Sequence, residues 1–264
     1  MKIFLPCRGE FGWIVMAHAP QVHAAIEPGD MVCCLPGLEA IYPGAASYFH
    51  VEPLHDREQA GMSLRDPGLA PLAQTLQSHH PDAQLIAPCP KAPRRYFLPA
   101  PTSVYGLACD VVVCPRRRGY GADKNWPHWQ EATDRLIDRG LRVFAAGTKA
   151  SSFDLRGVPR AWDYDRPLDA TIEAMSSSHL VLATDSGLAH LAVMCGRPLL
   201  MISHGEGLVA PGLNDDGKPY WPIQMDRFAQ ENHLSSSITV LSHAWDDLQR
   251  VMDAAASALA KEST

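Results

Sequence analysis

Apolar runs without polar alternation constrain this chain most strongly, and the clearest example lies within residues 179–206. Residues 180–183 lead into a Thr-Asp-Ser-Gly turn, a short apolar helix pattern ends at Gly196, and residues 199–202 are apolar again. A strand that is apolar at every position is typical of a sheet covered on both faces, whose strands are parallel and joined by helices. The stretch therefore predicts strand, turn, helix and strand in an α/β fold, with a ligand beyond the carboxyl ends of the strands.

The β/α alternation occurs in two series, and a proline-rich segment separates them. Residues 88–101 carry prolines at positions 88, 90, 93, 99 and 101 without hydrophobic periodicity, which predicts a linker. We therefore expect two Rossmann-like domains, residues 1–100 and 101–264, with a last helix at 243–260 whose apolar face could pack across both. The expected strands are residues 2–6, 31–35, 48–51, 84–87, 111–114, 141–146, 180–183 and 199–202, and the other expected helices are 13–26, 69–79, 126–139 and 167–176.

Composition limits the classes of protein to which the chain can belong. Of its 264 residues, 46% are hydrophobic and 20% are charged, which allows a large core. The formal net charge of −6 argues against broad affinity for nucleic acid or anionic membranes. The seven cysteines form no CxxC pair, so we expect reduced core thiols in a cytoplasmic protein. No window reaches the roughly 20 apolar residues of a transmembrane helix, while peripheral membrane contact stays open.

The turn at residues 185–190 has the features of an anion site. A helix begins there with unpaired amide hydrogens and a positive dipole end, which together favour phosphate. Gly187 lets a diphosphate approach the backbone, Ser186 can donate a hydroxyl hydrogen bond, and His190 returns to the same face four residues after Ser186. The alternative is that Asp185 or Ser186 only caps a buried helix and that His190 is a hydrogen-bonded core residue.

A basic loop follows the strand at 111–114 and also lies at the carboxyl edge of the expected sheet. It contains the cations Arg116, Arg117, Arg118 and Lys124. Guanidinium and ammonium groups gathered at that edge suit a diphosphate. The alternative is a solvated basic loop without a ligand.

These motifs resemble a known family when they are taken in order along the chain. Lys124-Asn125-Trp126-Pro127, the Asp-Ser-Gly turn with His190, and Gly196-Arg197-Pro198 look like the C-terminal half of the ADP-heptose:lipopolysaccharide heptosyltransferase family, glycosyltransferase family 9. The resemblance covers about residues 111–203. It implies the GT-B fold, in which two Rossmann-like domains face each other across a cleft. The nucleotide-sugar would bind in the C-terminal domain and the acceptor in the N-terminal one.

The resemblance also implies roles for individual residues. Asp185, Ser186, Gly187 and His190 would hold the donor diphosphate, and Lys124 would neutralise the leaving group. Arg116 and Arg118 are expected at the same diphosphate because of their charge and their place in the basic loop. An acid in the first β/α loop of the family acts as base or charge stabiliser, and Glu10 in Gly9-Glu10-Phe11-Gly12 occupies that place. The alternative for Glu10 is an ordinary acid stabilised by the dipole of a helix N-terminus.

Two departures from the family concern the nucleoside and the acceptor. The family carries an acid shortly after the strand that ends here at Gly147, where this chain has Thr148 and Lys149. The N-terminal half of this chain is also shorter than is usual in the family, so the identity of the acceptor cannot be transferred from it.

The histidines form no metal-binding motif and no DxD acid pair is present at the expected position, so we expect transfer without a metal or other cofactor.

The sequence thus predicts a glycosyltransferase of lipopolysaccharide or glycan biosynthesis. It would move a sugar from a nucleotide diphosphate donor to a hydroxyl of a glycan, lipid-linked or other acceptor, with inversion, and would bind no nucleic acid. A nucleotide-sugar epimerase or hydrolase of the same fold is one alternative. A sugar-nucleotide-binding module without catalysis is the other.

Overall fold

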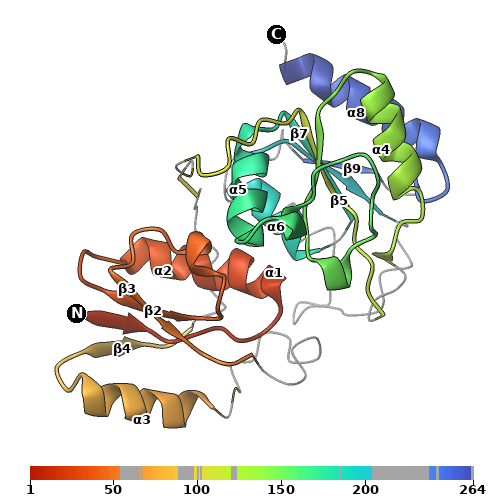
Figure 1. The fold of residues 1–264 in the computed structure, drawn as a ribbon. Helices are drawn as coiled ribbons and strands as arrows, with labels where there is room; N and C mark the ends of the chain where they lie inside the picture. Colours follow the sequence, from red (N-terminus) through yellow and green to blue (C-terminus); the bar gives the residue numbers. More distant parts are fainter. Residues whose placement is uncertain are drawn as a thin grey trace. The chain divides into compact units, whose positions relative to one another are not determined.

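The chain folds into two compact units, Met1–Leu98 and Pro99–Thr264 (Figure 1). The structure, a computed structural model, describes residues 1–53, 66, 68–88, 98, 99, 101, 103–119, 124–184, 186–203, 238–241 and 244–262. Each unit is built on one parallel sheet with helices packed on it. The expected α/β fold with two Rossmann-like sheets is therefore confirmed.

The N-terminal unit contains a four-stranded parallel sheet. Its strands are β1 (Lys2–Phe4), β2 (Met31–Cys34), β3 (Ser47–His50) and β4 (Gln84–Ile86), and its helices are α1 (Phe11–Trp13), the π-helix η1 (Ile14–His18), α2 (Ala19–Ala25), the 3-10 helix η2 (Glu39–Ile41) and α3 (Leu69–His79). The strand order is β3-β2-β1-β4, and Ile3 of β1 lies opposite both Met31 and Leu85. In Figure 1, α1 and α2 lie on one side of this sheet and α3 lies on the other.

A π-turn interrupts the first helical segment, which was expected as one regular α-helix over residues 13–26. The N–H of Ala19 donates to the carbonyl of Ile14, five residues earlier. Pro20 follows and has no amide hydrogen, so it cannot continue the regular i to i−4 ladder. The wider turn keeps the segment helical up to Ala25 and keeps Ile14 and Val22 buried.

The C-terminal unit contains a five-stranded parallel sheet. Its strands are β5 (Val111–Cys114), β6 (Val143–Ala145), β7 (Leu180–Thr184), β8 (Leu199–Ile202) and β9 (Ile238–Leu241). The described α-helices are α4 (Trp129–Asp138), α5 (Pro167–Ser177), α6 (Gly187–Met194) and α8 (Leu248–Glu262). Two 3-10 helices, η4 (Lys149–Ser151) and η5 (Ala161–Asp163), lie between β6 and α5. The strand order is β6-β5-β7-β8-β9. Strands β5 and β8 have the predicted bounds, whereas the edge strand β9 was not predicted. Helix α4 begins at Trp129 instead of 126, and α8 begins at Leu248 instead of 243, because the residues before each start form turns.

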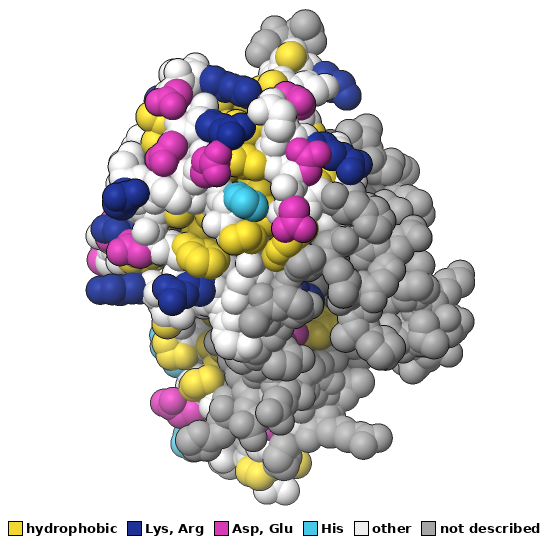
Figure 2. Space-filling model, turned by 90° about the vertical axis from the view of Figure 1, so that its right-hand side faces the viewer, with side chains coloured by type: hydrophobic (Ala, Val, Ile, Leu, Met, Phe, Trp, Pro, Cys, Tyr) yellow, Lys and Arg dark blue, Asp and Glu magenta, His cyan; other side chains and the backbone are white. Residues whose placement is uncertain are grey.

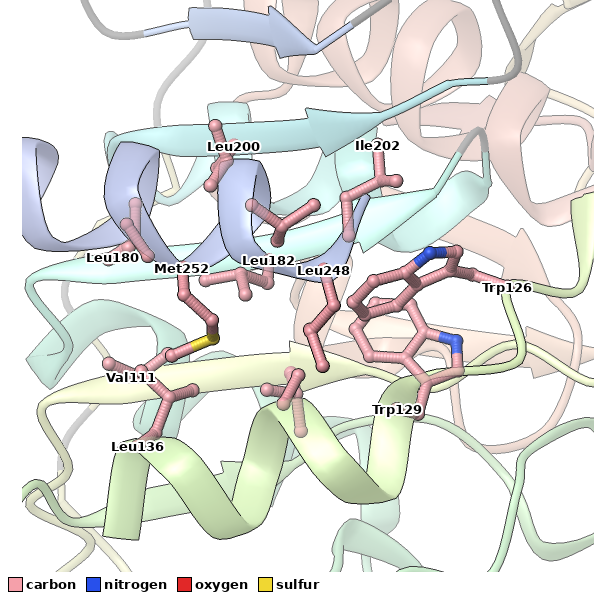
Figure 3. Close-up of a cluster of buried hydrophobic side chains, with 14 of the residues drawn as sticks. Val111, Trp126, Trp129, Leu136, Leu180, Leu182, Leu200, Ile202, Leu248 and Met252 are labelled. Carbon is pink, nitrogen blue, oxygen red and sulfur yellow. The ribbon is translucent and has the colours of Figure 1, made fainter. Parts of the chain in front are cut away.

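A hydrophobic core fills the space between this sheet and helices α4 and α8 (Figure 3). Val111, Leu182 and Leu200 come from three adjacent strands and meet Leu136 of α4 and Met252 of α8. Trp126 and Trp129 are fully buried at one end of this core, with ring centroids 5.0 Å apart and ring planes at 90°. The indole N–H of Trp126 donates to the carbonyl of Trp245 at 2.8 Å. This bond fixes the segment that carries Lys124 to the chain just before α8.

The surface of the C-terminal unit is mixed in charge. In the view of Figure 2, lysine and arginine side chains of this unit alternate with aspartate and glutamate side chains. Ion pairs such as Arg135–Glu131 and Arg142–Asp110 are examples. Within the described parts of the chain, no helix combines the length and hydropathy needed to cross a bilayer.

A buried carboxylate holds the beginning of the C-terminal unit. Glu173 in α5 is 5% exposed. Its oxygens accept hydrogen bonds from the Ser103 hydroxyl at 2.7 Å and from the backbone N–H groups of Val104, Tyr105 and Leu107 at 2.9, 3.0 and 2.8 Å. Burial alone would raise the pKa of Glu173, but these hydrogen bonds outweigh it and lower the pKa to about 2. The carboxylate therefore satisfies the amides of a turn that has no secondary structure of its own.

We expect Glu173→Gln to lower the free energy of unfolding of the C-terminal unit by about 2–3 kcal/mol at pH 7, because an amide nitrogen then faces main-chain donors. The folded pKa of about 2 lies below the ordinary 4.5, so the stabilisation is complete above about pH 5 and is lost as pH falls towards 2. The difference between wild type and variant should shrink over that range. Urea denaturation followed by tryptophan fluorescence measures it.

Glu131→Gln is the matched control, since Glu131 forms only an exposed pair with Arg135 on α4. Its effect should stay below about 1 kcal/mol. Equal losses in the two variants would contradict the role given to Glu173.

Candidate functional site

In each sheet the order of the strands reverses at one point, and the carboxyl edge at that point is the expected place for a ligand. In the C-terminal unit, β6 lies on one side of β5 while β7, β8 and β9 lie on the other. Ligands of open parallel sheets bind where the strand order reverses in this way, here between β5 and β7. The loops at that point carry Arg116 to Lys124 and Ser186 to His190, as the sequence predicts. In the N-terminal unit the reversal lies between β1 and β4, and the loop after β1 carries Glu10.

The loop after β5 is organised by Asn125. The side-chain oxygen of Asn125 accepts hydrogen bonds from Arg116 Nη1 at 2.8 Å and from the Arg118 backbone N–H at 3.0 Å, and its Nδ2 donates to the Arg118 carbonyl at 2.7 Å. Arg116 is only 9% exposed. Asn125 thus holds the predicted arginines against the segment that begins with Lys124. Asn125 was not among the predicted site residues, although its position inside Lys-Asn-Trp-Pro was a signal.

The loop after the edge strand β6 packs against the loop after β5 and approaches α6. Arg116 and Ser152 form an antiparallel bridge, and the Arg117 N–H donates to the Ser151 carbonyl at 2.8 Å. Gly147 has φ +139°, and a Cβ at this position would clash with the Ser152 hydroxyl and lie 3.9 Å from Leu188 in α6. The loop after β6 therefore meets the loop after β5 at Ser151 and Ser152 and approaches α6 at Gly147, where an added side chain would clash.

The turn between β7 and α6 contains buried hydroxyls without partners. Ser186 is the N-cap residue of α6, with extended backbone (φ −160°, ψ 164°), yet its side chain makes no capping hydrogen bond. Ser186 Oγ and Thr184 Oγ1 are both buried and have no hydrogen-bond partner among the described residues. The alternative that Ser186 serves only as a helix cap is therefore not supported by the geometry. Asp185 lies outside the described residues.

His190 is 6% exposed and follows Ser186 by one helical turn. Burial, and to a smaller extent the nearby charge of Lys124, lowers its pKa to about 4. The imidazole is consequently neutral at pH 7 and can offer a hydrogen bond but no charge. Lys124 lies within electrostatic reach of His190, so the basic loop and the start of α6 lie near each other.

Glu10 is at the N-cap position of α1 in the N-terminal unit. Its carbonyl accepts a hydrogen bond from the Trp13 N–H at 3.0 Å, and its side chain makes no capping hydrogen bond. Two residues earlier, the guanidinium of Arg8 forms an ion pair with Asp66, which also accepts from the Gly68 N–H at 2.8 Å. The loop that carries Glu10 is thereby tied to the start of α3.

A buried histidine supports the beginning of the same loop. His18 Nε2 donates to the carbonyl of Leu5 at 2.9 Å, and the Tyr42 hydroxyl donates to His18 Nδ1 at 2.7 Å. Burial lowers the pKa of His18 to about 4, which fits a neutral imidazole with one donor and one acceptor. This network fixes the main chain at the end of β1.

The described cysteines are free and, apart from Cys7, buried. Burial raises the pKa of Cys33 and Cys195 to about 12. No group of three or more histidine, cysteine, aspartate or glutamate side chains within the described ranges could hold a metal ion. Transfer without a metal stays a prediction.

Comparison with known proteins identifies the fold. No family model and no curated protein matches the sequence. E. coli ADP-heptose lipopolysaccharide heptosyltransferase II matches with a TM-score of 0.58 and 17% identity over 100% of both chains. A glycosyltransferase family 9 protein of Veillonella parvula matches with 0.56 and 10% over 98% of this chain and 97% of that one. E. coli heptosyltransferase WaaC, solved with ADP-2-deoxy-2-fluoro heptose, matches with 0.51 and 14% over 100% of both chains. The resemblance in fold thus extends well beyond residues 111–203, and the chain has the GT-B fold.

We expect Gly147→Ala to destabilise the C-terminal unit by about 1–3 kcal/mol, because it combines an unfavourable positive φ with a clash against Ser152. Gly140→Ala is the matched control, since Gly140 has φ +80° but open space around it. Its loss should be about 1 kcal/mol. Urea denaturation of the two variants makes the comparison, and a larger loss for Gly140→Ala would contradict the packing described for Gly147.

Proposed function

We propose that this chain is a glycosyltransferase that moves a sugar from a nucleotide diphosphate donor of ADP-heptose type to a hydroxyl group. The observation that carries the proposal is the buried Ser186 hydroxyl, which has no partner and lies at the N-terminus of α6. The amides and dipole of a helix start favour a phosphate at this position. The shared fold supports the proposal, since one of the similar structures was solved with an ADP-heptose analogue.

Cations on the neighbouring loop would neutralise the diphosphate. Asn125 orients Arg116 and Arg118, and Lys124 lies within electrostatic reach of His190. As the bond between the anomeric carbon and the diphosphate oxygen breaks, its electron pair passes to the diphosphate. Lys124 would stabilise that charge, while His190 and the Ser186 hydroxyl would donate hydrogen bonds. Asp185 and Gly187 belong to the same proposed site by the sequence resemblance.

Glu10 is proposed as the base of the reaction. It would accept the proton of the acceptor hydroxyl while that oxygen forms a bond to the anomeric carbon. Attack on the side opposite the leaving group inverts the configuration at this carbon. The hydrogen bonds and the ion pair that fix residues 5–8 support the role, because a base must be held in position.

The N-terminal unit would bind the acceptor, a glycan, lipid-linked or other hydroxyl compound of lipopolysaccharide or glycan biosynthesis in the cytoplasm. The nucleoside would lie near the loop after β6, where the hydroxyls of Thr148 and Ser151 are 2.7 Å apart. These hydroxyls occur where the family carries an acid. The proposal includes no metal, no other cofactor and no nucleic-acid partner.

Donor binding tests the proposed diphosphate site directly. The protein would be screened against ADP-, GDP-, UDP- and TDP-linked sugars by thermal unfolding. A true donor present at 100 times its dissociation constant adds about 2.7 kcal/mol to the free energy of unfolding and raises Tm by several degrees. Lys124→Ala should weaken donor binding about 10- to 100-fold, because a charged hydrogen-bond donor to the diphosphate is lost. Lys261→Ala, an exposed lysine near the end of α8, is the control and should bind the donor like wild type. Equal donor affinity of wild type and Lys124→Ala would refute the site.

Turnover tests the role of Glu10 separately. Glu10→Gln should lower kcat about 100-fold or more while donor affinity stays unchanged, as expected for loss of a general base. Glu27→Gln is the control, because Glu27 is exposed and pairs with Lys2 in the same unit.

Product analysis without acceptor separates the alternative functions. Steady conversion of the donor alone would favour an epimerase or hydrolase, and donor binding without any product would favour a binding module.

A further inference from the structure

Thr184, the last residue of β7, is completely buried, and its hydroxyl has no hydrogen-bond partner in the part of the chain that the structure describes. Other buried threonines of this unit are satisfied: Thr133 donates to the Trp129 carbonyl at 2.8 Å and Thr171 to the Pro167 carbonyl at 2.9 Å. An unpaired buried hydroxyl loses its hydration without compensation, so native proteins contain few of them. The hydroxyl of Thr184 therefore requires an explanation that the isolated fold does not supply.

The register of the sheet shows which way Thr184 points. Thr184 lies opposite Ile202 of β8, and Leu182 lies opposite Leu200. Ile202 and Leu182 belong to the core that faces α4 and α8, so alternation along β7 puts the Thr184 side chain on that same face. Figure 3 shows Trp126 at the end of this core, and Lys124 precedes it by two residues. Thr184 thus ends β7 on the Lys124 side of the sheet.

The second unpaired hydroxyl, Ser186 Oγ, begins α6 two residues later. A phosphate held between Lys124 and the start of α6 would lie beyond the carboxyl end of β7, the strand that Thr184 ends. A trapped water is a poorer partner for Thr184, because a buried water needs two to four polar neighbours and Leu182 and Ile202 are apolar.

We propose that Thr184 is a further donor-binding residue, whose hydroxyl donates a hydrogen bond to a phosphate oxygen of the nucleotide diphosphate. The inference rests on the proposed donor site. It adds to that site a residue on the face of the sheet that α4 and α8 cover. In the unliganded protein this hydroxyl is unsatisfied. In the complex it gains an anionic acceptor, which is the stronger kind of hydrogen bond.

Thr184→Val tests the inference, because valine keeps the branched shape and removes the hydroxyl. Removing an unsatisfied group should raise the Tm of the unliganded protein by about 2–6 °C. The same change should weaken binding of the nucleoside diphosphate that wild type binds best, among ADP, GDP, UDP and TDP, about 10-fold. Thr184→Ser keeps the hydroxyl and should bind that diphosphate within about threefold of wild type. Thr133→Val, which removes a satisfied buried hydroxyl, should not raise Tm and should leave binding unchanged.

Unchanged diphosphate affinity in Thr184→Val would overturn the inference and leave the donor site intact. A lower Tm of unliganded Thr184→Val would also overturn it, since the hydroxyl would then have a partner within the protein. If wild type binds none of the nucleoside diphosphates, the proposed function and this inference both fail. Calorimetric titration and thermal unfolding of the full chain supply the two measurements.

Discussion

Burial of β5, β7 and β8 on both faces is the constraint on which the C-terminal unit depends. Every residue of these three strands is buried. Helices α4 and α8 cover one face, and α5 and α6 lie on the other (Figure 1). Polar groups are excluded from the body of such a sheet and collect where its strands end. The loop that carries Arg116 and the turn that carries Ser186 therefore lie at the same edge of the sheet, although they are far apart in sequence.

The helices and strands that could be predicted were those whose burial leaves a clear pattern of apolar residues in the sequence. Strands β5 and β8 are continuous apolar runs, and α3 has helical periodicity over its whole length, so their bounds agree with the prediction. Strand β9 was missed because it is a short edge strand that is only partly buried, and Thr239 interrupts its apolar residues. The π-turn before Pro20 was also missed, since its cause is one absent amide hydrogen and hydrophobic periodicity does not report it.

The site was predictable to the extent that residue type alone determines chemistry. Glycine and serine at a helix start and cations after a strand indicated a diphosphate, and the structure brings these loops to one edge. Asn125 and Thr184 could not be found in this way, because their significance depends on hydrogen bonds that are made or missing in the folded chain. The neutral state of His190 likewise follows from its burial and its neighbour, which the sequence does not reveal.

The neutrality of His190 has a consequence for how the site responds to its surroundings. A histidine with an ordinary pKa changes charge near neutral pH, and many proteins use it as an acidity sensor. The pKa of His190 is about 4, so its imidazole keeps one proton and no charge throughout the neutral range. Arginine side chains do not titrate there either. The histidine therefore behaves as a fixed dipole, and moderate acidification of the surroundings leaves its contribution to the site unchanged.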